Sequence, residues 1–166
     1  LLLCINVNSE QAIDYIKGID PDFGIVFGTR KISNKVIEQF PDGLINVHRG
    51  ISEEYRGLDS DLWAIYHDDY SNIGVTIHKV EPSLDTGDIV YQDRLPLELH
   101  MKIYHLRYYT TLLATKLVIS ALRDYCSGAL QQSPQKKKGR YYSFMPIELK
   151  KVVNKKFNRY VETLSN

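Results

Sequence analysis

Residues 22–48 read DFGIVFGTRKISNKVIEQFPDGLINVH, and this stretch holds two short apolar runs on either side of a helical pattern. The runs Phe23–Phe27 and Leu44–His48 have the length and composition of buried strands. The residues Pro41-Asp42-Gly43 form a turn before the second run. Between the runs, apolar residues recur at helical spacing: Ile32, Val36, Ile37 and Phe40. The stretch therefore predicts a strand, a short helix and a second strand.

The segment before this stretch extends the same alternation. Leu1–Val7 is apolar enough for a further buried strand, and Asn8-Ser9-Glu10 is a plausible helix start. Apolar residues then follow at helical spacing up to Ile19. Strands that alternate with helices over short connections predict a Rossmann-like α/β fold, with a mostly parallel sheet and helices on both faces. Ligand sites on such sheets lie beyond the carboxyl ends of the strands.

Towards the C-terminus the pattern changes. A helix is expected over Asp59–His67, followed by strands at Gly74–Val80 and Asp88–Leu95, which form an antiparallel edge pair because their connection is too short for a parallel crossover. A long helix follows, with apolar positions from Ile103 to Leu122. We expect one domain over residues 1–126, a polar linker over 127–146 and a helical appendage over 147–166.

Composition narrows the class of protein. Of the residues, 43% are hydrophobic and 25% are charged, as in ordinary globular domains, and the net charge of +1 gives no general attraction to nucleic acid or membrane. No apolar run approaches the roughly 20 residues of a membrane helix. Two cysteines are too few for a disulfide framework, so we expect a cytoplasmic protein with neither a membrane nor a nucleic-acid partner.

Two polar residues end the second apolar run. Asn46 and His48 are two positions apart on one strand, so their side chains point to the same face. An amide donor beside an imidazole suits acyl transfer, in which an oxyanion develops and protons are exchanged. Asp85, in a tight turn between two strands, could orient the imidazole or a water. From these residues alone, ordinary polar capping of a strand end is the favoured interpretation.

Four segments in order extend this pattern. They are Leu44-Ile45-Asn46-Val47-His48, Tyr55-Arg56-Gly57, Gly74-Val75-Thr76-Ile77 and Leu84-Asp85-Thr86-Gly87-Asp88-Ile89. Together, over about residues 22–95, they resemble the folate-dependent formyltransferases, which include the glycinamide ribonucleotide, methionyl-tRNA and amino-sugar formyltransferases.

The resemblance implies a fold, a reaction and a site. It implies N-formylation of a small-molecule primary amine with 10-formyltetrahydrofolate as co-substrate and without a metal. The catalytic residues would be Asn46, a protonated His48 and Asp85. The folate would lie beside Gly28, Thr29, Arg30, Lys31 and Ile32 and beside Pro82, Ser83 and Leu84. Arg49, Tyr55, Arg56, Gly57 and Trp63 would lie on the side of the amine acceptor.

Departures from the family leave the acceptor open. Family members often continue after the histidine with Pro-Ser-Leu-Leu-Pro, whereas this chain has Arg49-Gly50-Ile51-Ser52. The resemblance also implies an earlier strand, loop and helix, so residues 1–126 would be a catalytic domain without its first βαβ part. We expect an amino sugar or nucleotide sugar as acceptor. The alternatives are a glycinamide ribonucleotide or methionyl-tRNA formyltransferase, or a catalytically incomplete folate- or nucleotide-binding module.

Other signals have simpler interpretations. Asp85-Thr86-Gly87 also spells the aspartic-protease triplet, but those enzymes lack long helices such as the two that follow it here. Trp63 could stack on a ligand, although a place in the core is favoured. Lys136-Lys137-Lys138 is expected to be solvated surface, and His78 a surface or satisfied residue. His100 and His105 face apart on a helix and have no third metal ligand. A homodimer remains possible through the last helix.

Overall fold

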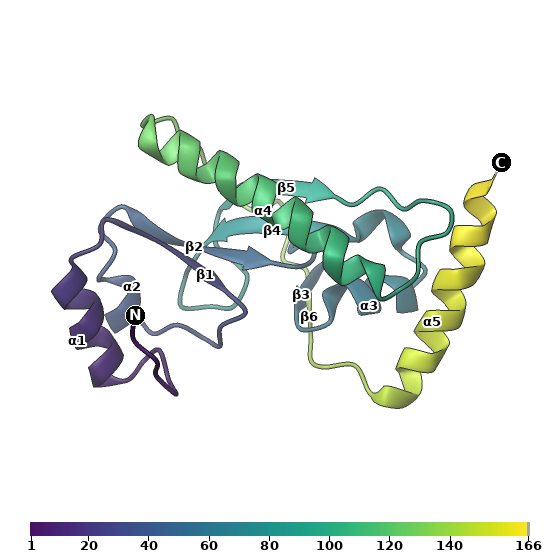
Figure 1. Cartoon of the computed structure of the whole chain (residues 1–166), viewed down its shortest axis with the longest axis horizontal. Helices are drawn as coiled ribbons and strands as arrows, with labels where there is room; N and C mark the ends of the chain where they lie inside the picture. The colour runs from purple at the N-terminus through teal and green to yellow at the C-terminus, as the bar shows by residue number, and fades with distance from the viewer. Residues whose placement is uncertain (166) are drawn as a thin grey trace.

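The computed structural model describes residues 1–165 of the chain. From residue 10 onward its helices and predicted strands follow in the order expected from apolar spacing, with two additional short strands, β3 and β6 (Figure 1). The helices and strands are α1 (Glu10–Ile19), β1 (Phe23–Phe27), α2 (Asn34–Ile37), β2 (Gly43–His48), β3 (Tyr55–Gly57), α3 (Ser60–Tyr66), η1 (Tyr70–Asn72), β4 (Gly74–Lys79), β5 (Ile89–Arg94), α4 (His105–Cys126), β6 (Arg140–Tyr142), α5 (Ile147–Glu162) and η2 (Thr163–Ser165).

The central sheet has four strands in the order β1-β2-β4-β5. Strands β1 and β2 are parallel, and each of the pairs β2–β4 and β4–β5 is antiparallel. The antiparallel register sets Asn46 of β2 directly opposite His78 of β4. Two segments far apart in sequence, β3 and β6, form a separate parallel pair beside this sheet.

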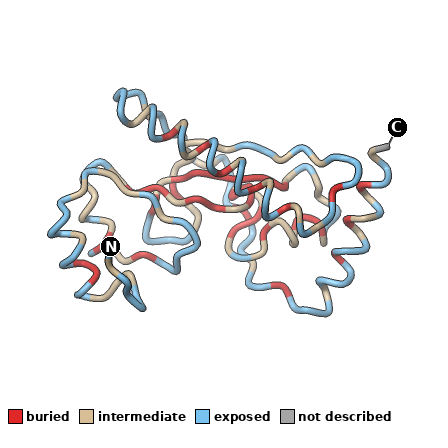
Figure 2. The backbone as a smooth tube through the Cα atoms, viewed as in Figure 1, coloured by how far each residue is buried: buried red, intermediate tan, exposed pale blue. Residues whose placement is uncertain are grey.

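Helices cover both faces of the sheet. On one face, Ile45 and Val47 of β2 pack with Ala114, Leu117 and Ala121 of α4. On the other face, α1 and α2 contribute to a smaller core: Ile13, Ile32, Val36, Leu44 and Val80. Alternation along β2 explains the division, because successive side chains of a strand point to opposite faces. Figure 2 shows the buried positions gathered along the central strands.

A second apolar core lies at the C-terminal end of the fold. Helix α5 packs against α3, and its Val153 and Phe157 are fully buried there with Ile65. The helix N-terminal boundary follows Pro146, which fixes the backbone before the first turn. The last helix therefore packs on its own chain through this apolar face.

Two segments differ from the expectation. Leu1–Val7 forms no strand, and the side chains of Leu1, Leu3 and Ile5 are exposed. An apolar run becomes a strand only when its backbone pairs with a neighbour, and β1 pairs with β2 alone. The polar segment 127–146 lies along the domain, because Ser133 pairs with Ile89 and β6 pairs with β3. Within residues 1–165, no helix is long and apolar enough to cross a membrane.

Candidate active site

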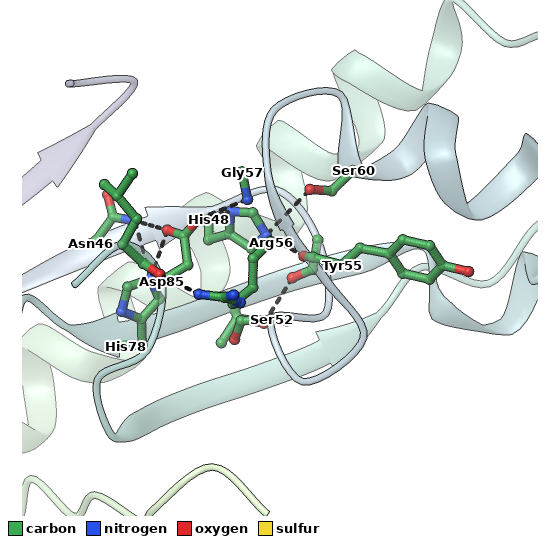
Figure 3. Close-up of polar contacts among 12 residues, drawn as sticks. Asn46, His48, Ser52, Tyr55, Arg56, Gly57, Ser60, His78 and Asp85 are labelled. Carbon is green, nitrogen blue, oxygen red and sulfur yellow. Dashed lines mark hydrogen bonds and ion pairs between the residues drawn. The ribbon is translucent and has the colours of Figure 1, made fainter. Parts of the chain in front are cut away.

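Strands β2 and β4 bring three polar side chains to one face of the sheet (Figure 3). Asn46 and His48 leave β2 on the face opposite α4, and His78 leaves β4 beside them. The Nδ2 atom of Asn46 lies 3.1 Å from Nε2 of His78. The imidazole of His48 is buried, and that of His78 is buried as well. The sheet thus brings an amide and two imidazoles together on one face.

Asp85 completes this group from the turn between β4 and β5. Its Oδ2 atom lies 3.6 Å from Nδ1 of His48, and its Oδ1 atom lies 3.3 Å from Nε2 of His78. Asn46 donates to the same Oδ1 over 3.4 Å, and the Gly57 amide donates to Oδ2 over 2.9 Å. One carboxylate therefore contacts both histidines and the Asn46 amide. Of these contacts, the one between His48 and Asp85 is expected from the resemblance.

The surroundings keep the Asp85 carboxylate ionised. Burial by itself would raise the pKa of Asp85, but its contacts with His78, His48 and the Gly57 amide outweigh burial and lower the pKa to about 2. Burial also lowers the pKa of His48, and the nearby Asp85 only partly offsets it. At neutral pH the site thus holds a carboxylate and a neutral His48, whereas the resemblance implied a protonated His48.

The tautomer of His48 follows from its neighbours. Its Nε2 atom lies 2.8 Å from the carbonyl oxygen of Tyr55, and a carbonyl can only accept. The Nε2–H group therefore donates to Tyr55, and the Nδ1 lone pair faces Asp85. An imidazole held in this way can take a proton at Nδ1, and the resulting cation is stabilised by the carboxylate 3.6 Å away.

Arg56 and Gly57 hold the turn that carries Asp85. The guanidinium of Arg56 donates to the carbonyls of Leu84, over 2.9 Å, and of Gly139, over 2.6 Å. Gly57 has φ +90, and a Cβ atom there would lie 2.1 Å from the Tyr142 carbonyl oxygen. The backbone of Gly57 can approach both Tyr142 and Asp85 only because it carries no side chain. Both residues contact the catalytic turn directly.

The other residues expected on the acceptor side lie elsewhere. Tyr55 is buried in the second core, where its hydroxyl donates to Asp69. Trp63 stacks on Tyr142, with ring centroids 4.8 Å apart, and donates to the Ser143 carbonyl. Arg49 is the residue after β2; it donates to Thr111 of α4 and covers the Phe27 ring. The structure does not bring these three side chains to the group around Asp85.

The two segments expected beside the folate both lie on the surface. Gly28 to Lys31 are exposed after the end of β1, whereas Ile32 is buried with α1 and α2. Pro82, Ser83 and Leu84 are exposed on the turn immediately before Asp85. Some of their carbonyls already accept hydrogen bonds within the chain: that of Lys31 from Asn8, that of Ser83 from Thr86 and that of Leu84 from Arg56.

His78 is the residue that sequence reasoning missed. The alternating strand predicts a surface or satisfied residue at this position, yet His78 contacts both Asn46 and Asp85. Pairing β2 with β4 in antiparallel register would have revealed it, because Asn46 and His78 are then direct partners. His48, His78 and Asp85 nonetheless form no metal-binding group, and none occurs elsewhere among residues 1–165.

A buried group with one amide, two imidazoles and a carboxylate, at the carboxyl end of an α/β sheet, is suited to acyl transfer. The amide can donate to a developing oxyanion, and the neutral imidazole beside a carboxylate can accept a proton. Residues 6–122 match the family described as Formyl transferase. The chain belongs to this family.

Several relatives support the assignment. A methionyl-tRNA formyltransferase from Caldicellulosiruptor saccharolyticus is 33% identical over 117 residues, covering 70% of this chain and 37% of the relative. The chain spans less than half the length of such curated relatives. The formyltransferase PseJ from Anoxybacillus kamchatkensis, in complex with UDP-4,6-dideoxy-4-formamido-L-AltNAc and tetrahydrofolate, is 27% identical. It has a TM-score of 0.65 and covers 87% of this chain and 71% of its own.

A third protein extends the likeness to a larger molecule. HypX from Aquifex aeolicus, in complex with tetrahydrofolic acid, is 25% identical with a TM-score of 0.70. The match covers 82% of this chain and 24% of that chain. The same fold therefore occurs both in a protein of similar extent and as part of a longer one.

Proposed function

We propose that the chain transfers a formyl group from 10-formyltetrahydrofolate to a primary amine, at the group formed by Asn46, His48 and Asp85. The observation that carries this proposal is the carboxylate of Asp85, which contacts His48 at 3.6 Å and Asn46 at 3.4 Å on one face of the sheet. Family membership supports the reaction, and the tetrahydrofolate bound in PseJ and HypX supports the donor.

The roles of the residues follow from their hydrogen bonds. The amine nitrogen attacks the formyl carbon, and the carbonyl electrons move to the oxygen, which becomes an oxyanion. Asn46 donates a hydrogen bond to that oxygen. It uses the Nδ2 hydrogen that, in this structure, makes the 3.4 Å bond to Asp85. His48 accepts the amine proton at Nδ1, and Asp85 stabilises the imidazolium. The intermediate then collapses, the bond from carbon to N10 breaks, and N10 takes the proton that His48 accepted, which restores the neutral imidazole.

His78 and the turn residues would support these steps. His78 donates from Nδ1 to the Lys79 carbonyl over 2.8 Å, which leaves its Nε2 to accept from Asn46. This fixes the orientation of the Asn46 amide. The folate would bind over the exposed backbone of residues 28–32 and 82–84, in contact with the face that carries Asp85.

An amino sugar carried on a nucleotide is the acceptor we favour. PseJ, the solved relative of which this chain covers 71%, is bound to a formamido sugar nucleotide. The curated methionyl-tRNA formyltransferases favour a second acceptor, an aminoacyl-tRNA, although this chain spans 37% of one such relative. A binding module without catalysis is the remaining alternative. The cytoplasm, where folates and nucleotide sugars are available, is the proposed location.

The test is release of tetrahydrofolate in the presence of a panel of amines. The chain is incubated with 10-formyltetrahydrofolate and, in separate reactions, UDP-linked 4-amino sugars, glycinamide ribonucleotide and methionyl-tRNA. Release that depends on the amino sugar and is lost in His48→Ala supports the proposal. Folate binding without release for any amine would favour the binding module, and release with methionyl-tRNA alone would favour the second acceptor.

A further inference from the structure

Asp85 lies on a turn that has no regular structure of its own. Residues 80–88 belong to no helix or strand, and Pro82, Ser83 and Leu84 are exposed. Asp85 also has φ +53, a left-handed conformation that costs a non-glycine residue on the order of 1 kcal/mol or more. Contacts from outside the turn are therefore needed to hold the carboxylate in place.

Those contacts come from residues 133–142, the segment that follows α4. Ser133 exchanges two backbone hydrogen bonds with Ile89, of 2.8 and 2.9 Å, at the end of the turn. At the other end, Arg56 links the carbonyls of Leu84 and Gly139. Gly139 is buried so tightly that a Cβ atom would lie 2.4 Å from the Ser52 carbonyl oxygen. The segment therefore crosses the turn and is fixed on both sides of it.

Gln135 makes the central contact. Its side-chain Nε2 donates to the carbonyl of Asp85 over 3.0 Å and to the carbonyl of Gly87 over 2.9 Å. Both hydrogens of the amide are used, so one side chain fixes the backbone on either side of Thr86. The Oε1 atom of Gln135 is buried without a hydrogen-bond partner among the described residues. The contact of Gln135 with the turn therefore consists of its two donated hydrogen bonds.

We propose that Gln135 is a positioning residue for the catalytic carboxylate: its two donated hydrogen bonds set the backbone of Asp85 so that Oδ2 meets the Gly57 amide and His48. The proposal rests on the proposed function for its effect on turnover. It assigns a role in the active site to residues 133–142, which are part of the segment 127–146 that the sequence predicts to be a linker. The carboxylate is correctly placed only while this segment lies across the turn.

The test replaces the donor without changing the shape. Gln135→Glu has the same size, but it presents carboxylate oxygens to two carbonyls and donates to neither. Gln135→Met removes the same donors without adding charge, and it serves where Gln135→Glu does not fold. The matched control is Gln131→Glu, the same chemical change at an exposed position four residues earlier. Three readouts are compared with the parent chain: kcat and KM for formyl transfer, the melting temperature, and the amide resonance of Gly57.

We expect kcat to fall about 10- to 100-fold in Gln135→Glu, since a displacement of about 1 Å in a catalytic group costs on the order of 10²-fold. KM for the folate should stay within about twofold, and Gln131→Glu should match the parent. The Gly57 amide should move upfield in Gln135→Glu as its bond to Asp85, now 2.9 Å, lengthens. This resonance needs no turnover, so it tests the positioning even if the parent transfers no formyl group.

Two results would overturn the inference. One is an unchanged kcat together with an unchanged Gly57 resonance in both Gln135 variants. The other is a parallel loss of melting temperature, folate affinity and kcat in both variants, since a purely structural role predicts all three. If the parent chain transfers no formyl group but the Gly57 resonance still moves in the Gln135 variants, the proposed function is wrong and the positioning role of Gln135 stands.

Discussion

The carboxylate of Asp85 lies 3.3 Å from Nε2 of His78, the residue seven positions earlier on the neighbouring strand. The same carboxylate lies 3.6 Å from Nδ1 of His48 on β2. Two imidazoles from two strands therefore share one carboxylate, and Asn46 contacts both His78 and Asp85. This arrangement makes the orientation of the Asn46 amide depend on His78.

His78→Gln should lower turnover without abolishing it. The variant replaces the fixed Nε2 acceptor that orients the Asn46 amide with a flexible side chain. A neutral hydrogen bond is worth about 0.5–1.5 kcal/mol, and each 1.4 kcal/mol corresponds to about tenfold in rate. We therefore expect kcat to fall about 3- to 10-fold while the affinity for a folate analogue is kept. Steady-state kinetics and a binding titration measure both quantities. An unchanged kcat would mean that His78 only fills space.

Acid should destabilise the fold through His48. Because burial lowers the pKa of His48 below its ordinary 6.5, the unfolded chain takes up this proton more readily than the folded one. The contribution to stability is complete above pH 6.5 and is lost as the pH falls below it. Asp85, with a pKa of about 2, stays ionised over this range.

The measurement is the melting temperature at several values between about pH 7.5 and pH 5. The fall in the parent should be larger than the fall in His48→Gln, which has no group to protonate. A control variant, His100→Gln at an exposed position before α4, should follow the parent. If His48→Gln and the parent lose the same number of degrees, then His48 is not held neutral by burial.

Gly57→Ala should unfold the chain more easily. A methyl group there would lie 2.1 Å from the Tyr142 carbonyl oxygen, and the φ of +90 is unfavourable for alanine. The positive φ alone costs about 1–3 kcal/mol. Gly18→Ala is the matched control, since a Cβ in α1 meets nothing within 4 Å and alanine favours a helix by up to about 1 kcal/mol. Denaturant unfolding should therefore show opposite signs for the two variants; equal effects would refute the tight contact at Gly57.

A folate analogue should perturb two separate surface segments. Residues 28–32 follow β1 and residues 82–84 precede Asp85, and all of them except Ile32 are exposed. Amide resonances of these residues should shift as a non-reactive 10-formyltetrahydrofolate analogue is titrated. Shifts confined to α5 would place the folate elsewhere, and the proposed donor site would then be wrong.

The sequence predicted most elements because apolar spacing reflects local geometry. Helix α4 and strands β2 and β4 lie where that spacing put them. Apolar spacing failed to predict the elements whose formation depends on pairing between distant segments. Leu1–Val7 is apolar but unpaired, and β6 lies in a polar segment that pairs with β3. His78 and Gln135 were missed for the same reason, since each contacts Asp85 through tertiary structure.

The resemblance predicted the catalytic trio, because Asn46, His48 and Asp85 taken one by one do not distinguish a catalytic site from ordinary polar residues. The side chains predicted on the acceptor side were harder to place. Arg49 lies on the α4 face because side chains alternate along β2, and Tyr55 and Trp63 belong to the second core. A sequence motif identifies the segment near a site, but which side chain points into the site depends on register.

The most direct test compares His48→Ala and Asn46→Ala with the parent chain, by formyl transfer and by thermal unfolding. Both side chains act on charge that forms only in the transition state, so their loss should lower turnover about 10²–10³-fold. The melting temperature and the affinity for folate should change little, because the truncations open no large apolar cavity. Variants that melt well below the parent yet keep its rate within a few-fold would contradict the account, and the site of formyl transfer would then lie elsewhere.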